Sequence, residues 1–211
     1  MNKIVLIGDS IRKGYDRFVR LAFKEVAEVC YTEDNCRFAA YVLRHIYDWK
    51  NEFGGGDDVD LVHWNAGLWD SLVLEDDEPL VPVEIYKYYI ERVCKLIKNS
   101  FPKAKVIFAT STPVREELFG VLKRYNKDIE MYNAVAVEIA QKYGFEINDL
   151  YEIVKTVPKD YYSDMTHLYT KEGTRLISDK VIGCIENALG IKADKLDYDK
   201  LFEEAENIIG L

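Results

Sequence analysis

Short apolar runs of strand-forming residues alternate along this chain with longer segments of helical periodicity, and this alternation constrains the fold more than any other feature. The run at 3–7 (Lys-Ile-Val-Leu-Ile) stops at Gly8 and is typical of a strand buried on both faces, as in a parallel sheet. Similar runs, some of them weaker, give five expected strands, at 3–7, 28–31, 59–64, 104–110 and 145–147.

The segments between and after these runs have the periodicity of amphipathic helices. Within 84–98, for example, Ile85, Tyr89 and Val93 recur at helical spacing with charged residues opposite them. Such alternation predicts right-handed crossovers and an α/β fold, a three-layer α/β/α sandwich around a five-stranded parallel sheet. An active site in this fold would lie outside the carboxyl ends of the strands. Helices are expected at 11–27, 37–49, 84–98, 128–142 and 171–189.

The length of the chain, 211 residues, is that of one ordinary domain. No change of composition marks a boundary, so we expect residues 1–211 to form a single domain. One more amphipathic helix, strongly charged, is expected around 193–209 and would pack on the outside of that domain. Its apolar side would carry Leu201, Phe202, Ala205 and Ile208.

Composition and charge exclude several classes of partner. A formal net charge of −9 disfavours nucleic acid, because polyanion binding relies on clustered lysine and arginine. No apolar stretch approaches the roughly 20 residues that a membrane span needs. The apolar run at the N-terminus is too short for a signal peptide, so a cytoplasmic location is expected. There the four cysteines, which lack the spacing of a zinc site, would be reduced thiols.

A candidate nucleophile follows the first expected strand in Gly8-Asp9-Ser10. This position puts the Ser10 hydroxyl at the carboxyl edge of the sheet, beside the N-terminus of a helix. There the Ser10 N–H would stabilise the oxyanion that forms when an acyl carbonyl is attacked. The alternative is that Asp9 or Ser10 only caps the helix, since both residue types are favoured at that position.

The base that a serine nucleophile requires is indicated by Asp164 and His167, three positions apart in a loop before the last long helix. Within one tight loop this spacing lets the carboxylate accept the imidazole Nδ1–H, leaving Nε2 to take the serine proton. The chain has only three histidines, and His45 and His63 fall within helix and strand patterns. His167 is therefore the default base, although a lone histidine is more often a surface or capping residue.

The loop after the third expected strand, Asn65-Ala66-Gly67-Leu68-Trp69-Asp70, adds a polar side chain at the same edge. An amide is a suitable donor to an oxyanion because it gives a hydrogen bond without titrating. The alternative is that Asn65 and Asp70 shape a turn around Gly67.

Taken together, these three blocks resemble the ordered motifs of the SGNH (GDSL-type) hydrolase superfamily, and they span nearly the whole chain. The resemblance implies a flavodoxin-like esterase that uses no metal or organic cofactor. It also implies that Ser10 is the nucleophile, His167 the base and Asp164 its orienting carboxylate, with Ser10 and Asn65 as oxyanion donors.

Two departures from the family pattern bear on the oxyanion donors. The usual Gly-x-Asn-Asp block reads Gly67-Leu68-Trp69-Asp70 here, so Asn65 is expected to replace the missing asparagine. The usual glycine after the second strand is absent from Asn35-Cys36-Arg37-Phe38. Because any residue except proline supplies a backbone N–H, the Arg37 N–H is the expected replacement.

Five residues near these motifs are expected to contact the substrate. One is the neighbour of the nucleophile, and two are tryptophans that could stack on a sugar ring. The other two belong to the segment 108–114, which is similar to the carbohydrate-esterase side of the family. Core packing and a proline turn are the alternative interpretations. The five are Asp9, Trp64, Trp69, Thr112 and Pro113.

These observations favour an esterase that acts on small acyl esters, acetyl esters above all, with an acylated sugar as a possible substrate. The two departures leave open a non-catalytic, decayed module on the same fold, since a fold alone does not guarantee activity. A metal-dependent phosphoesterase is a third hypothesis, but three histidines offer few ligands for a two-metal site.

Overall fold

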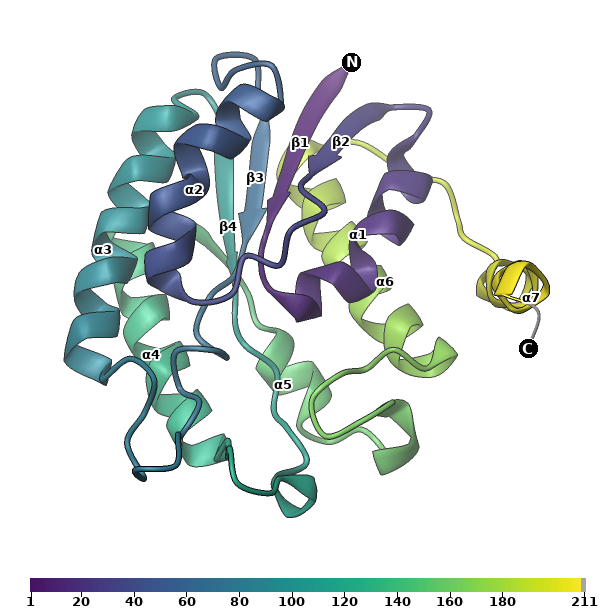
Figure 1. Ribbon diagram of the computed structural model, residues 1–211. Helices are drawn as coiled ribbons and strands as arrows, with labels where there is room; N and C mark the ends of the chain where they lie inside the picture. The colour runs from purple at the N-terminus through teal and green to yellow at the C-terminus, as the bar shows by residue number, and fades with distance from the viewer. Residues whose placement is uncertain (210–211) are drawn as a thin grey trace.

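The computed structural model describes the backbone of residues 1–209 and the side chains of residues 1–204. Five parallel strands form one sheet in the order β2-β1-β3-β4-β5, which confirms the predicted fold class (Figure 1). This order is that of flavodoxin-like sheets. The chain adds β2 on one side of β1 and then adds β3, β4 and β5 on the other side. The strands are β1 (Asn2–Ile7), β2 (Ala27–Tyr31), β3 (Leu61–Trp64), β4 (Lys105–Ala109) and β5 (Glu146–Asn148).

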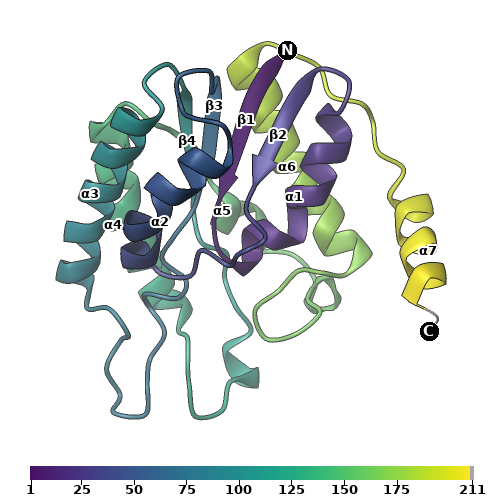
Figure 2. The same cartoon turned by 45° about the horizontal axis from the view of Figure 1, so that its top comes forward.

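Helices cover both faces of this sheet (Figures 1 and 2). One layer consists of three long helices, α2 (Ala39–Glu52), α3 (Val83–Ser100) and α4 (Asn126–Lys142). The opposite layer contains α1 (Ser10–Phe23), the short α5 (Leu150–Val154) and α6 (Lys171–Leu189). The result is the expected three-layer sandwich.

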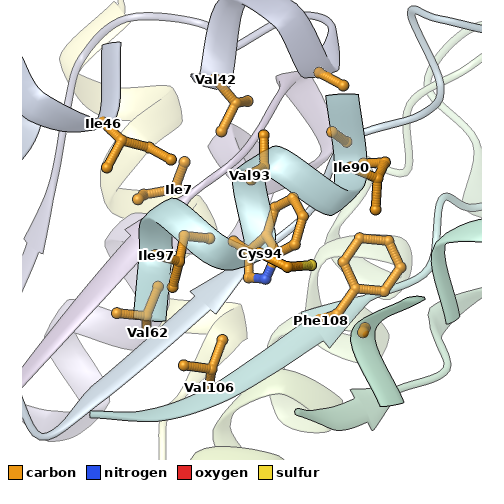
Figure 3. Packing of buried hydrophobic residues seen from close by; sticks show 14 of the residues in the cluster. Ile7, Val42, Ile46, Val62, Ile90, Val93, Cys94, Ile97, Val106 and Phe108 are labelled. Atoms are coloured by element: carbon orange, nitrogen blue, oxygen red, sulfur yellow. The ribbon is translucent and has the colours of Figure 1, made fainter. Parts of the chain in front are cut away.

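Successive side chains of the central strands pack alternately against the two helix layers. In β1, Val5 and Ile7 belong to the buried cluster under α2, α3 and α4, whereas Ile4 and Leu6 belong to the cluster under α1 and α6. Figure 3 shows Ile7 among the side chains of the first cluster, with valines of α3 and of β3. Burial on both faces explains why the strands appear in the sequence as continuous apolar runs.

The last helix, α7 (Tyr198–Ile209), lies at the edge of the molecule beside α1 (Figure 1). Phe18 of α1 lies 5.6 Å from the ring of Tyr198 and 6.0 Å from that of Phe202, which is stacked on it. Lys171 and Asp179 of α6 add an ion pair to Asp199 and a hydrogen bond from the Tyr198 hydroxyl. The expected outer helix is thus present from residue 198. The expected apolar positions 205 and 208 lie outside the described side chains, and the single-domain organisation stays a prediction.

Every strand ends at the same edge of the sheet, and two long connections extend beyond that edge (Figure 2). One connection joins β3 to α3 and the other joins β4 to α4. They pair with each other through Val73 and Lys123, whose backbones exchange two hydrogen bonds of 2.8 and 3.0 Å. This rim is where the polar motifs of the sequence converge. Within residues 1–209, none of the helices combines the length and the apolar character that crossing a membrane requires.

Candidate active site

Ser10 is the first residue of α1 and follows β1 after only two residues, so its hydroxyl lies at the carboxyl edge of the sheet. Asp9 is the helix cap, because its Oδ1 accepts a 2.9 Å hydrogen bond from the backbone N–H of Ile11. Gly8 is required for close packing: a Cβ there would lie 1.9 Å from Oδ1 of Asn65. The tight turn therefore exposes the Ser10 hydroxyl at the edge of the sheet. It also lets the loop that follows β3 pack against Gly8.

The imidazole of His167 joins Ser10 to Asp164. Nε2 of His167 lies 2.8 Å from Oγ of Ser10, although the two residues are 157 positions apart. On the other side of the ring, Nδ1 lies 2.7 Å from Oδ2 of Asp164. The structure thus brings together the three side chains that the sequence singled out, in the order hydroxyl, imidazole, carboxylate.

Asp164 is held by its own loop. Its Oδ1 accepts hydrogen bonds from the backbone N–H groups of Thr166 and His167, at 2.6 and 2.8 Å. Burial alone would raise the pKa of Asp164, but these two bonds and the bond to the imidazole outweigh it and lower the pKa below its ordinary value. The carboxyl therefore stays ionised at neutral pH and can stabilise a protonated imidazole.

Tyr169, which the sequence did not single out, supports this arrangement. Its ring stacks on that of His167 with 4.6 Å between the centroids, and its hydroxyl donates a hydrogen bond to the backbone carbonyl of Ser10. Gly14 leaves room for the ring, since a Cβ at that position would lie 2.7 Å from it. A glycine inside a helix was the only sequence signal of this contact.

The other two histidines lie away from this site. His45 is on α2, with Nδ1 3.2 Å from Asp48. His63 is fully buried in β3, with Tyr15 and Asn148 within hydrogen-bond reach of its two ring nitrogens. Burial lowers the pKa of His63 to about 3, so this ring is neutral and belongs to the core.

Of the three predicted oxyanion donors, Ser10 and Asn65 stay predictions, and Arg37 is contradicted by the structure. The backbone N–H of Ser10 makes no hydrogen bond within the described residues, and the Asn65 side chain packs directly against Gly8. The prediction for Arg37 is wrong, because its N–H donates to Oδ1 of Asn35 at 3.0 Å. Arg37 has a φ of 47°, so the local turn directs this N–H back into its own loop.

The start of α2 offers replacements for the Arg37 donor. The loop is fixed there by Cys36, whose N–H donates to the carbonyl of Gly8, and by Ala39, whose N–H donates to both oxygens of Asp70 at 3.1 Å. Within the described residues, the N–H groups of Phe38 and Ala40 on either side of Ala39 make no hydrogen bond. These two groups are free donors within three residues of the predicted one.

Two buried carboxyl groups lie behind the rim. Burial raises the pKa of Asp9, while the Asn65 amide, the Ile11 N–H and the positive charges of Arg124 and His167 act in the opposite direction. Burial likewise raises the pKa of Asp70 to about 7. The prediction that Asp9 contacts substrate is wrong, because the side chain is fully enclosed and serves as the cap of α1.

The other predicted substrate contacts divide into buried and half-buried residues. Trp64 is fully buried and packs against Phe108 at 4.9 Å, so the prediction that it lines the cleft is wrong. It sits on the face of β3 that α2, α3 and α4 cover. Thr112 and Pro113 are buried as well, which is contrary to the prediction that they contact the substrate. Trp69 alone is half-buried at the rim, with the guanidinium of Arg124 6.0 Å from its ring.

Known proteins resemble this chain in sequence and in fold. No family model matches the sequence. The chain is 24% identical to a GDSL esterase/lipase of Arabidopsis thaliana over 221 residues, which cover 93% of this chain and 90% of that protein.

Solved structures share the fold. A lipase/acylhydrolase from Enterococcus faecalis superposes with a TM-score of 0.70 at 20% identity, covering 93% of this chain and 100% of that one. An acetyl xylan esterase superposes with a TM-score of 0.69 at 17% identity, covering 87% of this chain and 99% of that one. The predicted resemblance to the GDSL-type (SGNH) hydrolases is thereby confirmed, and the chain shares the fold of these lipases and esterases.

Proposed function

We propose that the chain hydrolyses small acyl esters, acetyl esters in particular, through an acyl-enzyme on Ser10, and that acetylated sugars are among its substrates. The observation that carries this proposal is the 2.8 Å approach of His167 Nε2 to Ser10 Oγ, on an imidazole whose Nδ1 is held by Asp164. A serine hydroxyl is a poor nucleophile at neutral pH unless such a base accepts its proton.

In the first half of the reaction, Oγ of Ser10 attacks the ester carbonyl and its proton passes to Nε2 of His167. The carbonyl oxygen becomes an oxyanion that accepts hydrogen bonds from the Ser10 N–H and the Asn65 amide, with a free N–H at the start of α2 as a further donor. Asp164 stabilises the imidazolium. The intermediate then collapses: the bond to the alcohol oxygen breaks, and Nε2 returns the proton to the leaving alcohol.

In the second half, water attacks the acyl-enzyme carbonyl and gives its proton to Nε2. Collapse of the second intermediate breaks the bond to Oγ, and Nε2 reprotonates the serine. The products are the acid and the alcohol. Side chains and backbone groups of this chain carry out each proton transfer and stabilise each charge.

The preference for acetyl esters of sugars is supported by the fold of an acetyl xylan esterase and by the aromatic residues of the rim. Trp69 is half-buried, and Tyr169 remains partly exposed beside the nucleophile. Aromatic rings at such positions provide the flat apolar surface on which sugar rings stack.

The test is hydrolysis of 4-nitrophenyl esters of rising acyl length and of acetylated xylo-oligosaccharides by wild type and Ser10→Ala. We expect turnover that is greatest with acetate and that Ser10→Ala abolishes while the melting temperature stays unchanged. A fluorophosphonate probe should label wild type at Ser10. Absence of both labelling and turnover in folded protein would instead establish a non-catalytic binding module.

A further inference from the structure

Arg124 is held between the two rim loops by contacts on three sides. Its Nε donates a 2.7 Å hydrogen bond to the carbonyl of Leu68, in the loop that carries Asn65. Its guanidinium lies 6.0 Å from the ring centroid of Trp69 and 5.8 Å from that of Phe119. The preceding residue, Lys123, pairs with Val73 through the backbone. The position of this cation is therefore fixed by both loops.

The same contacts place Arg124 close to the nucleophile. Leu68, which accepts this hydrogen bond, is three residues after Asn65, and the side-chain oxygen of Asn65 lies against Gly8, two residues before Ser10. The positive charge of Arg124 lowers the pKa of Asp9, the neighbour of Ser10, more than the charge of His167 does.

This guanidinium is not paired directly with a carboxylate of the described residues. A guanidinium has five N–H donors, and within the described residues only Nε of Arg124 makes a hydrogen bond. Among the described residues no carboxylate is within ion-pair distance of it, and the carboxyl that raises its pKa through space is the buried Asp9. Burial lowers the pKa of Arg124, so the side chain sits in a partly dehydrated place where an anion would be bound more strongly than in water.

We propose that Arg124 is a specificity-determining residue that binds a carboxylate of the substrate, so that the preferred esters carry a negative charge a few atoms from the scissile carbonyl. This inference rests on the proposed function and names a substrate class for it. The two Nη groups present the planar, paired donors that match the two oxygens of a carboxylate. Trp69 and Phe119 flank the same place and would contact the carbon atoms that connect the carboxylate to the ester.

The competing interpretation is that Arg124 only holds the loop of Leu68 in place. The two interpretations differ in what removal of the guanidinium does. A purely structural arginine affects the hydrolysis of all esters alike, whereas a carboxylate-binding arginine affects the anionic esters selectively.

The test compares matched pairs of esters that differ in one charge. For the acyl side, the pair is 4-nitrophenyl succinate and its methyl ester. For the alcohol side, the pair is 3-acetoxybenzoate and its methyl ester. For each pair, the ratio of kcat/KM for the anionic to the neutral ester is measured in wild type, Arg124→Gln and Arg124→Lys. The matched control is Lys127→Gln, which removes an exposed positive charge three residues away.

In wild type we expect one of the two pairs to favour the anionic ester by about tenfold to a hundredfold, the range of a charge-assisted pair of hydrogen bonds. Arg124→Gln should reduce that ratio to about one, Arg124→Lys should retain part of it, and Lys127→Gln should leave it unchanged. Added salt should lower the wild-type ratio.

The inference is overturned if neither pair shows a preference in wild type, or if Arg124→Gln lowers both members of a pair equally. The first of these outcomes is measured on the wild-type protein alone. The inference can therefore be contradicted even if a variant fails to fold. The proposed function fails separately, if Ser10→Ala retains wild-type turnover of every ester in the set.

Discussion

The phenol ring of Tyr169 lies against the imidazole of His167, with 25° between the two planes, while its hydroxyl is hydrogen-bonded to the backbone of Ser10. One side chain therefore contacts both residues that exchange the proton in the proposed reaction. The imidazole is fixed at three points: Nδ1 by Asp164, Nε2 by Ser10, and one face by Tyr169. Rotation of the ring out of line would break all three contacts.

Tyr169→Ala should lower kcat by about threefold to tenfold, because an aromatic pair contributes roughly 0.5–1.5 kcal/mol to holding the imidazole in place. Tyr169→Phe keeps the stacked ring and should retain most of kcat. KM for 4-nitrophenyl acetate should change little in either variant, since the ring positions His167. A loss in Tyr169→Phe equal to that in Tyr169→Ala would assign the effect to the hydroxyl instead.

Asp164→Asn should reduce kcat by about two to four orders of magnitude, since an amide favours the wrong imidazole tautomer and cannot stabilise the imidazolium. The matched control is Asp160→Asn, an exposed position in the same loop, which should keep wild-type kcat. Steady-state kinetics at pH 7–8 on both variants measures the difference. Asp164→Asn activity within tenfold of wild type would remove this carboxylate from the proposed mechanism.

Gly8→Ala should damage both stability and activity. The added Cβ would lie 1.9 Å from Oδ1 of Asn65 and 2.8 Å from Cβ of Arg12, so the Asn65 side chain must move. We expect a loss of about 1–3 kcal/mol in unfolding free energy. Loss of one oxyanion donor would lower kcat by up to about a hundredfold.

The control for this substitution is Gly183→Ala, inside α6, where an added Cβ meets nothing within 4 Å. Alanine favours a helix interior over glycine by up to about 1 kcal/mol, so this variant should be as stable as wild type or more so. Urea denaturation and 4-nitrophenyl acetate turnover compare the two. A Gly8→Ala protein that behaves like Gly183→Ala would show that Asn65 can move without cost.

The buried carboxyl of Asp70 should make stability depend on pH. Its pKa is raised by burial from 3.8 to about 7, so between these values the folded state binds more protons than the unfolded state. The unfolding free energy contributed by this group is therefore highest below about pH 4, falls as the pH rises to about 7 and is level above that.

Asp70→Asn removes this titration but keeps an oxygen for the Ala39 N–H. The variant should gain stability relative to wild type by up to about 4 kcal/mol between pH 4 and pH 7.5, measured as the difference of two urea titrations. Glu75→Gln, at an exposed position of the same loop, should follow wild type at both pH values. A constant difference between Asp70→Asn and wild type would show that Asp70 does not titrate in this range.

The fold could be predicted from the sequence because its signals are local and repeated. Continuous apolar runs specify strands that are covered on both faces, and helical periodicity between them requires parallel crossovers. The candidate triad could be predicted for a different reason. Asp164 and His167 are close in sequence, and the chain offers only two other histidines, both within regular elements.

The errors concern groups whose roles depend on geometry that the sequence does not show. Whether the Arg37 N–H is free depends on a turn with positive φ, and that turn uses the N–H for Asn35. A strand that is apolar on both sides does not reveal which layer its last residue faces, so Trp64 was predicted at the rim and is in the core. Tyr169 and Arg124 act through contacts with segments far away in sequence.

The backbone pairing of Val73 with Lys123 joins the two rim loops, so that the position of one loop depends on that of the other. An insertion or deletion in either loop would shift the register of this pairing and with it the cation at position 124. Substrate preference in this scaffold should therefore change through coordinated alterations on both sides of the pairing. Grafting a single loop from an esterase of the same fold would misplace the guanidinium while leaving the proton-transfer groups intact.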